Sequence, residues 1–215
     1  MRRMTDVEIL VPLQFDHSDL LHAARAAHLG DHLFLLTDPA VRATERCAYA
    51  PGDVVRCATK QDADGRSRHV VVETVPEQAD TVSMWLELHD SVLTGARGRE
   101  TDVLLAPGYV HRWEVREGVR FGTGWTCIVR FRIEGLTIER GGPVDAGPLD
   151  GGTLETPEGT HANVIPVPLA ATGPVRLWLD RSSGRILELS GDGIEVKLVG
   201  DPVFVEALPA ELDRR

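Results

Sequence analysis

The sequence contains no uninterrupted apolar run that approaches the roughly 18 residues needed for a membrane-spanning helix. Its first apolar stretch, Ile9-Leu10-Val11, ends at Pro12 and is too short for the hydrophobic part of a secretory signal. Basic residues are also few, because 23 Lys and Arg face 33 Asp and Glu for a formal net charge of −10. Nucleic acids and anionic membranes attract basic surfaces. We therefore expect a cytoplasmic protein that binds neither membranes nor nucleic acids.

Cysteine and lysine are scarce. The three cysteines, Cys47, Cys57 and Cys127, include no C-x-x-C pair, so they provide no zinc framework and fit a reducing compartment as small buried hydrophobes. Lysine occurs only at positions 60 and 197, and arginine takes its place elsewhere, a bias typical of GC-rich bacterial genomes. We expect a bacterial protein with no metal site and no cofactor.

The chain of 215 residues is 42% hydrophobic and 26% charged, which is enough apolar material for a folded core. Its length fits two small domains or one β-rich domain. Helix signals nearly vanish after Pro76. The sequence therefore predicts an α+β, predominantly antiparallel β protein. It has a mixed α/β segment at residues 1–76, a β-sandwich or β-barrel domain at 77–209, and a tail at 210–215.

Two helices are expected in the N-terminal segment. Capping residues at Asp16-His17-Ser18-Asp19 precede an Ala/Leu-rich segment that closes at Gly30, which predicts a helix of about three turns. Asp38-Pro39 opens a second, shorter helix with proline at its first position. Strands are expected at residues 6–12, 32–37, 54–59 and 69–73, of which the last two form a hairpin.

After Pro76 apolar and polar residues alternate with a period of two, the pattern of half-buried antiparallel strands. The alternation covers residues 82–89, 109–116, 125–134 and four shorter runs between 175 and 205. Turn residues at 181–184 and at Gly191-Asp192-Gly193 separate the shorter runs into a meander. Many short strands at this spacing are typical of a sandwich or a barrel.

A Gly- and Pro-rich segment, Gly141–His161, interrupts the strands. Loops of about twenty residues are uncommon in compact domains unless they are functional or mobile. Two interpretations stay open for this segment, a disordered connector and a lid over a site.

Several familiar enzyme signatures are excluded. The GxG at Gly122–Gly124 leads into an alternating strand, whereas a dinucleotide-binding fingerprint opens a helix. No P-loop and no GxSxG motif occurs, and Ser91 follows a strand without a nucleophile elbow. The pair His89-Asp90 ends a strand, unlike the helical His-Asp pairs of metal-dependent phosphohydrolases, so we do not read it as a metal site.

Strand parity singles out His111. It alternates with Arg112 and shares the parity of Tyr109 and Trp113, so we expect its side chain to face inward between two aromatic rings. In the same way Trp125 leads the inward row of the next strand.

Asp90 is the candidate partner of His111. It has the parity of Leu86, which predicts a carboxylate at the end of an inward row, whereas His89 points away from the core with Glu87. In one interpretation His111 is a core histidine whose polar atoms are satisfied by Asp90 or a carbonyl. In the other, Asp90 orients His111 as a general base or a polar anchor in an aromatic pocket.

Two further residues could complete such a pocket. His161 and Asn163 stand at the end of the Gly- and Pro-rich segment, where they are either turn residues or, if that segment is a lid, part of a site. The full candidate pocket consists of Tyr109, His111, Trp113, Trp125, His161 and Asn163.

Arginines lie on the predicted outward faces of two successive strands. They are interspersed with Glu114 and Glu134, so we expect a solvated cross-strand ladder of charges. Its arginines are Arg112, Arg116, Arg130 and Arg132.

Short motifs of the chain resemble uncharacterised β-rich bacterial proteins, including some toxin-immunity proteins. The resemblance rests on residues 88–91, 109–112 and 122–125, and on Gly193-Ile194 with Phe204-Val205-Glu206. It implies a non-enzymatic binding protein that neutralises a partner, and it supplies no catalytic residues.

Two functions from different classes follow. The first is a binding protein of the immunity type that recognises a protein partner through its surface, which the charge of −10 favours if the partner is basic. The second is a small-molecule enzyme or ligand carrier, of the cyclase or isomerase kind, that uses the aromatic pocket around His111.

Overall fold

The structure is a computed structural model and contains only β-strands and loops in the residues it describes. These are residues 6–11, 22–37, 49–61, 63–78, 83–94, 99–141 and 146–212. Within those ranges no helix is long and apolar enough to cross a membrane. The prediction of predominantly antiparallel β structure is confirmed, and the prediction of helices is not supported.

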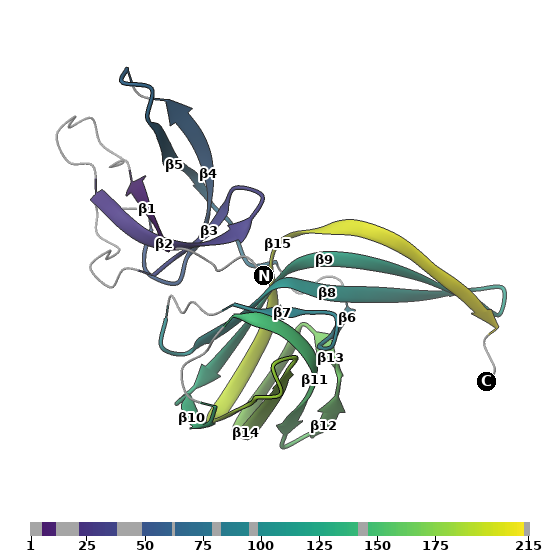
Figure 1. Ribbon diagram of the computed structural model, residues 1–215. Coiled ribbons are helices and arrows are strands. Elements are labelled where there is room, and N and C mark those ends of the chain that lie inside the picture. The colour runs from purple at the N-terminus through teal and green to yellow at the C-terminus, as the bar shows by residue number, and fades with distance from the viewer. Residues whose placement is uncertain are drawn as a thin grey trace. The chain divides into compact units, whose positions relative to one another are not determined.

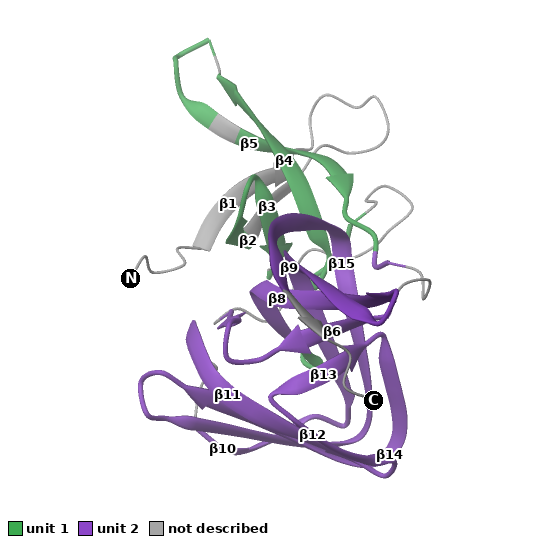
Figure 2. Ribbon diagram, turned by 90° about the vertical axis from the view of Figure 1, so that its right-hand side faces the viewer, with its two compact units in different colours: residues 1–76, 95–102 green, residues 77–94, 103–215 purple. Residues whose placement is uncertain are grey.

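The chain forms two compact units, coloured separately in Figure 2. Unit 1 comprises residues 1–76 together with 95–102, and unit 2 comprises residues 77–94 together with 103–215.

Unit 1 is a closed barrel of strands that follow one another in sequence order, seen at the purple and blue end of Figure 1. Neighbouring strands are antiparallel, and β5 closes the barrel by pairing in parallel with β1 at Leu10 and Val70. Its strands are β1 (Asp6–Val11), β2 (His22–Gly30), β3 (Leu33–Leu36), β4 (Val54–Gln61) and β5 (Ser67–Thr74). The predicted hairpin at 54–73 is therefore present as β4 and β5.

The predicted helix ending at Gly30 is wrong from His22 onward, because His22–Gly30 forms strand β2. Ala26 and Ala27 are fully buried, and β2 pairs with β1 on one side and β3 on the other. Alanine favours helices in isolation, but its intrinsic preference is a weak term that tertiary pairing overrides. Residues 12–21 and the predicted helix at Asp38-Pro39 lie outside the described residues.

Unit 2 is built on a ten-stranded sheet. Along its path the strands run β10, β15, β14, β11, β7, β8, β6 and β13, with β12 paired to β11 and β9 paired to β15 and β8. The strands are β6 (Met84–Glu87), β7 (Val92–Leu93), β8 (Asp102–Arg116), β9 (Val119–Glu134), β10 (Thr137–Arg140), β11 (Gly147–Thr156), β12 (Gly159–Ala162), β13 (Val164–Val167), β14 (Leu169–Arg181) and β15 (Ile186–Leu212).

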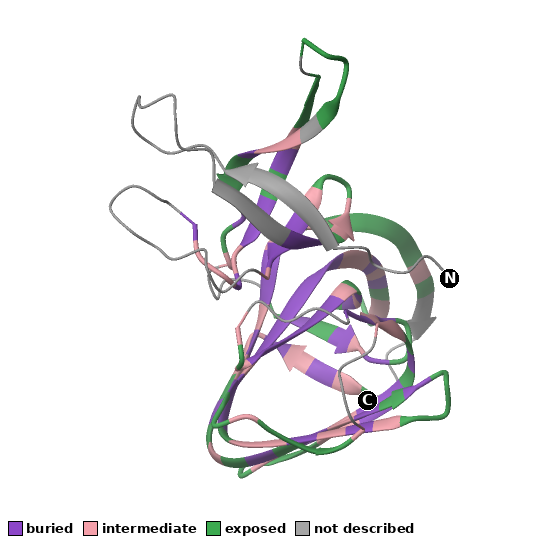
Figure 3. Ribbon diagram, turned by 60° about the vertical axis from the view of Figure 1, so that its left-hand side comes forward, coloured by how far each residue is buried: buried purple, intermediate pink, exposed green. Residues whose placement is uncertain are grey.

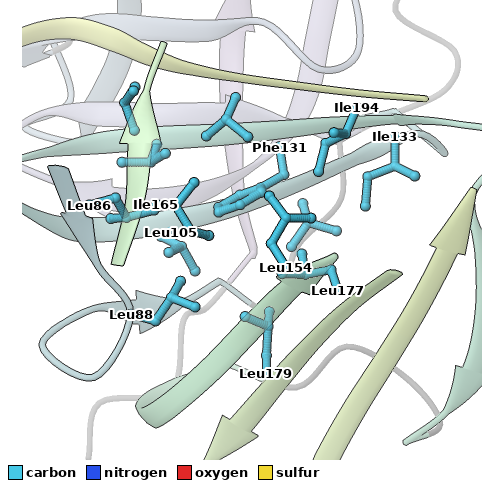
Figure 4. Packing of buried hydrophobic residues seen from close by; sticks show 14 of the residues in the cluster. Leu86, Leu88, Leu105, Phe131, Ile133, Leu154, Ile165, Leu177, Leu179 and Ile194 are labelled. Carbon is cyan, nitrogen blue, oxygen red and sulfur yellow. The ribbon is translucent and has the colours of Figure 1, made fainter. Parts of the chain in front are cut away.

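One apolar core lies inside this sheet, and Figure 4 shows side chains from β6, β8, β9, β11, β13 and β14 meeting in it. The row predicted to face inward on β9 does so, because Cys127, Val129, Phe131 and Ile133 all belong to the core and Trp125 packs against it. Figure 3 marks the buried residues along the strands of unit 2 in purple.

The prediction of a long loop at Gly141–His161 is wrong for most of its length, which forms β11 and β12. The glycines that suggested a loop instead allow a register shift and close packing within the sheet. Gly151 has a φ of 155° at a register shift against β14, and a side chain on Gly152 would overlap the carbonyl oxygen of Trp178. Residues 142–145 lie outside the described residues.

The predicted turn at Gly191-Asp192-Gly193 is also wrong, because β15 runs through it without interruption. A side chain on Gly191 would overlap the carbonyl oxygen of Glu134, so this glycine permits a close approach of two chain segments. The irregularity falls on β14, whose register against β15 shifts between Thr172 and Val175.

Strands β8 and β9 are joined by a two-residue turn whose residues, Glu117 and Gly118, have φ values of 52° and 75°. Positive φ at both positions is the type I′ geometry that fits the twist of a hairpin. Figure 1 shows β8, β9 and the last part of β15 running side by side as long strands toward this turn. We call this part of unit 2, residues 112–126 and 203–212, the arm.

Candidate functional site

Strand β6 pairs with β8 in a register that sets Trp85 opposite His111 and Glu87 opposite Tyr109. Residues that pair directly across antiparallel strands share a face. Leu86 lies opposite Val110, and both belong to the core. His111 therefore lies on the face of the sheet that points away from the core of unit 2, the face of Glu87, and the expectation from parity that it faces inward is wrong.

His111 is nevertheless buried, with 9% of its surface exposed, because aromatic rings cover this face. The ring of Tyr109 lies on Gly124 and that of Trp113 on Gly122, where any side chain would overlap them. Tyr109 donates its hydroxyl hydrogen to Oε1 of Glu206 over 3.2 Å. Burial, this hydrogen bond and nearby carboxylates raise the pKa of Tyr109 to about 12.

Trp113 holds the His111 ring. The indole Nε1–H donates to Nδ1 of His111 over 2.6 Å, and the two rings meet edge to face. The Arg120 guanidinium lies 4.7 Å from the centre of the Trp113 ring. Burial lowers the pKa of His111 and the charge of Arg120 acts in the same direction, while Glu87 opposes both.

The carboxylate beside His111 is that of Glu87, not that of Asp90. Nε2 of His111 lies 3.4 Å from Oε1 of Glu87, and Nε2 has no hydrogen-bond partner. The other Glu87 oxygen, Oε2, lies 3.1 Å from Nδ1 of His89. Asp90 is half exposed, with Oδ2 3.1 Å from Nε2 of His89, so the expectation of an inward Asp90 is wrong. The chain turns after Leu88, and strand parity ends there.

The remaining candidate residues do not join His111. Tyr109 covers Gly124 on one face of β9, so the next residue, Trp125, projects from the other face, where it packs against the core and against Phe204. Asn163 has a φ of 59° and accepts a hydrogen bond from the backbone of Gly152 over 2.9 Å.

His161 lies in β12, paired with Leu154 of β11. Two surface cavities of about 740 and 430 Å³ are lined by residues such as Glu139, Arg176 and Asp192, and Arg132 and Glu195, respectively. None of the six candidate pocket residues lines either cavity.

The prediction of an exposed arginine ladder is wrong for Arg130. Its side chain is 6% exposed and Nη1 lies 2.6 Å from Oε1 of Glu77. Arg132 is partly buried and reaches the same oxygen as well as Glu195. Arg112 and Arg116 are exposed beside Glu114, as predicted, but both ion pairs lie within β8 and do not cross between strands. Glu77, from the segment before β6, thus forms ion pairs with two arginines of β9.

The arm exposes large apolar side chains. Val203, Phe204 and Val205 follow one another in β15 with 62%, 53% and 50% of their surfaces exposed. Val115 and Phe121 are 47% and 46% exposed on the neighbouring strands. The pairing register of β15 with β9 shifts between Val199 and Val203 and again between Phe204 and Glu206. Phe204 and Val205 were predicted as part of the last strand and of a motif, but a strand pattern gives no sign that its apolar residues lack a covering layer.

The group formed by Glu87, His89, Asp90 and His111 was not predicted from the sequence. Glu87 and His89 are two residues apart, and Oε2 of Glu87 lies 3.1 Å from Nδ1 of His89. The approach of His111 depends on the pairing of β6 with β8, which a single sequence does not show. No protein-family model, curated protein or solved structure matches this chain.

Proposed function

We propose that this protein is a binding protein that recognises a protein partner through the arm. The observation that carries the proposal is the exposed run Val203-Phe204-Val205. Exposed apolar patches on soluble proteins mark interaction sites, and a run of three consecutive exposed apolar residues is costly unless it has a function.

The proposed mode of recognition is the addition of a strand to β15. Within the described residues, positions 203–212 pair with β9 alone, so one edge of this segment presents unpaired backbone groups. An extended segment of a partner can hydrogen bond to such an edge, while side chains such as Val203 and Val205 give specificity.

The net charge of −10 supports a basic partner, because charge complementarity speeds association and selects partners. The complex should therefore weaken as salt is raised. Neutralisation of a toxin is a narrower form of the proposal and rests on the resemblance to immunity proteins. The free thiols of Cys57 and Cys127 support a cytoplasmic location.

The alternative, a small-molecule enzyme or carrier, needs Tyr109, His111, Trp113 and Trp125 to line one pocket. The ring of Tyr109, from β8, lies over one face of β9, whereas Trp125 projects from the other face. We therefore favour the binding protein.

The test is reconstitution of a complex between the purified chain and the product of the neighbouring gene, with affinity measured by titration calorimetry at two salt concentrations. The double variant Val203→Lys/Val205→Lys should weaken the complex at least tenfold, because it adds charge to the proposed contact. The matched control is Val72→Lys in β5, since Val72 is as exposed as Val203 at 62%. It should leave the affinity unchanged.

Equal effects of the two sets of lysines would contradict the proposed surface. A complex whose affinity is the same with and without the lysines at positions 203 and 205 would also contradict it. Self-association that the lysines in β15 abolish would show that the partner is a second copy of this chain rather than another protein.

A further inference from the structure

We propose that Glu87, His89 and Asp90, at the end of β6, bind a first-row divalent cation such as Zn²⁺. One ligand atom from each of the three lies within 4.8 Å of the others. Imidazole and carboxylate are ligands that zinc, iron, nickel and manganese accept. The site is separate from Val203 and Val205, and it does not depend on the proposed partner.

The spacing of Glu87 and His89 suits one ion. Oε2 of Glu87 and Nδ1 of His89 are 3.1 Å apart. Two ligands at the usual zinc distances in a tetrahedral site are about 3.3 Å apart. These two groups therefore need little movement to share an ion, and the side-chain exposure of 47% for His89 leaves room for water as a further ligand.

Asp90 completes the site by rotation. Its Oδ2 now lies 3.1 Å from Nε2 of His89, the nitrogen that faces away from Glu87. Only one nitrogen of His89 can bind a given ion. Because the Asp90 side chain is 52% exposed, its carboxylate is free to turn toward an ion at Nδ1.

An independent observation points to the same place. His111 is 9% exposed, and its Nε2 has no hydrogen-bond partner although it lies 3.4 Å from Oε1 of Glu87. Since Trp113 donates to Nδ1, the neutral imidazole carries its hydrogen on Nε2, the nitrogen nearest to Glu87. A small movement of Glu87 closes this hydrogen bond.

His111 is therefore a positioning residue and not a ligand. In the proposed metal-bound state it donates to Oε1 of Glu87, the oxygen that faces away from His89, which leaves Oε2 for the ion. Carboxylate ligands of metals are commonly held by an outer hydrogen bond of this kind, and its loss typically weakens metal binding by about 10- to 100-fold.

The same three groups could also form an ion network without metal, in which a protonated His89 donates to both carboxylates. The two arrangements differ in one measurable property. A metal site binds one ion per chain and is stabilised by it, whereas an ion network gains nothing from added cation.

The experiment uses the full chain and titrates ZnCl₂, MnCl₂ and MgCl₂ separately, with stoichiometry from equilibrium dialysis and melting temperature as a second readout. We expect one Zn²⁺ or Mn²⁺ per chain and a rise in melting temperature. Glu87→Gln and His89→Gln should each weaken binding at least tenfold. Glu139→Gln in β10 and His161→Gln in β12 are matched surface controls and should bind as the unchanged chain does.

The role of His111 is tested by two variants. His111→Leu should weaken binding by about 10- to 100-fold, and His111→Gln, which keeps an N–H donor, should recover a large part of that loss. Circular dichroism checks that each variant is folded. Failure of the folded chain to bind any of the three ions, or equal binding by Glu87→Gln, His89→Gln and the controls, would overturn the proposal.

Discussion

The indole N–H of Trp113 donates to Nδ1 of His111, two residues earlier in β8, over 2.6 Å. Indole is only a donor, so this bond fixes the hydrogen of a neutral His111 on Nε2. Nε2 in turn faces Glu87, whose other oxygen faces His89. The hydrogen bond from Trp113 therefore determines that His111 presents a donor, and not an acceptor, to Glu87.

Replacing Trp113 by Phe removes this donor but keeps an aromatic ring over Gly122. Because Nδ1 of buried His111 loses its partner, the free energy of unfolding should fall by about 1–2 kcal/mol. Urea unfolding followed by circular dichroism measures it. Trp85→Phe, at a 43% exposed position on the same face, is the control and should change stability by less than about 0.5 kcal/mol. Equal losses in both variants would contradict the role of the Trp113 N–H.

Replacing Glu77 by Gln should destabilise unit 2 by about 3 kcal/mol, because it removes a carboxylate from the buried Arg130 and from Arg132. All four tryptophans lie in unit 2, so their fluorescence follows the unfolding of this unit alone. Glu114→Gln breaks the exposed pairs with Arg112 and Arg116, which solvent screens, and should therefore cost far less stability than Glu77→Gln. A comparable loss in both variants would show that burial of Arg130 is unimportant.

The same carboxylate gives unit 2 a sensitivity to acid. Burial raises the pKa of Glu77. The hydrogen bond and charge of Arg130, together with the charges of Arg132 and Lys197, lower this pKa by more than burial raises it, so the net pKa is below its usual value. The stabilisation is complete above the unfolded pKa of about 4.3 and is lost as the pH falls through the lower folded pKa. The stability difference between the unchanged chain and Glu77→Gln should shrink below about pH 4. Urea midpoints from pH 3 to 7 test this, and a constant difference would count against it.

Gly152→Ala should destabilise unit 2 by about 1–3 kcal/mol, because the added methyl would overlap the carbonyl oxygen of Trp178 and a methyl of Leu88. A methyl group added to Gly147, in the same strand, would meet no described atom within 4 Å, so Gly147→Ala should be nearly neutral. Melting temperatures of the two variants provide the measurement. A neutral Gly152→Ala would mean that β11 and β14 pack less closely than described.

The sequence predicts the strands of unit 2 best where one face is purely apolar. Cys127, Val129, Phe131 and Ile133 alternate with polar residues, and this row enters the core as expected. Turns and loops were predicted wrongly at several glycines, because the sequence does not distinguish a glycine that permits close packing, such as Gly152 or Gly191, from a glycine in a turn. A helix was predicted wrongly at Ala26 for a related reason, since a small residue fits both a helix and a tightly paired strand.

The site was predicted only in part, because parity assigns faces within one strand but not between strands. On β8 both faces carry large residues, so nothing in the sequence indicates that Val110 rather than His111 enters the core. The register of β6 and β8 settles it by setting Glu87 beside Tyr109. The buried Arg130 was missed because its partner Glu77 lies 53 residues away.

Hydrogen exchange of the arm tests the proposed function most directly. When the protein partner is added at saturating concentration, the backbone amides of residues 203–212 should exchange more slowly, since a strand added to β15 would bond to its open edge. The amides of β5 in unit 1 should be unaffected. A complex that forms without slower exchange in residues 203–212 would contradict recognition through β15.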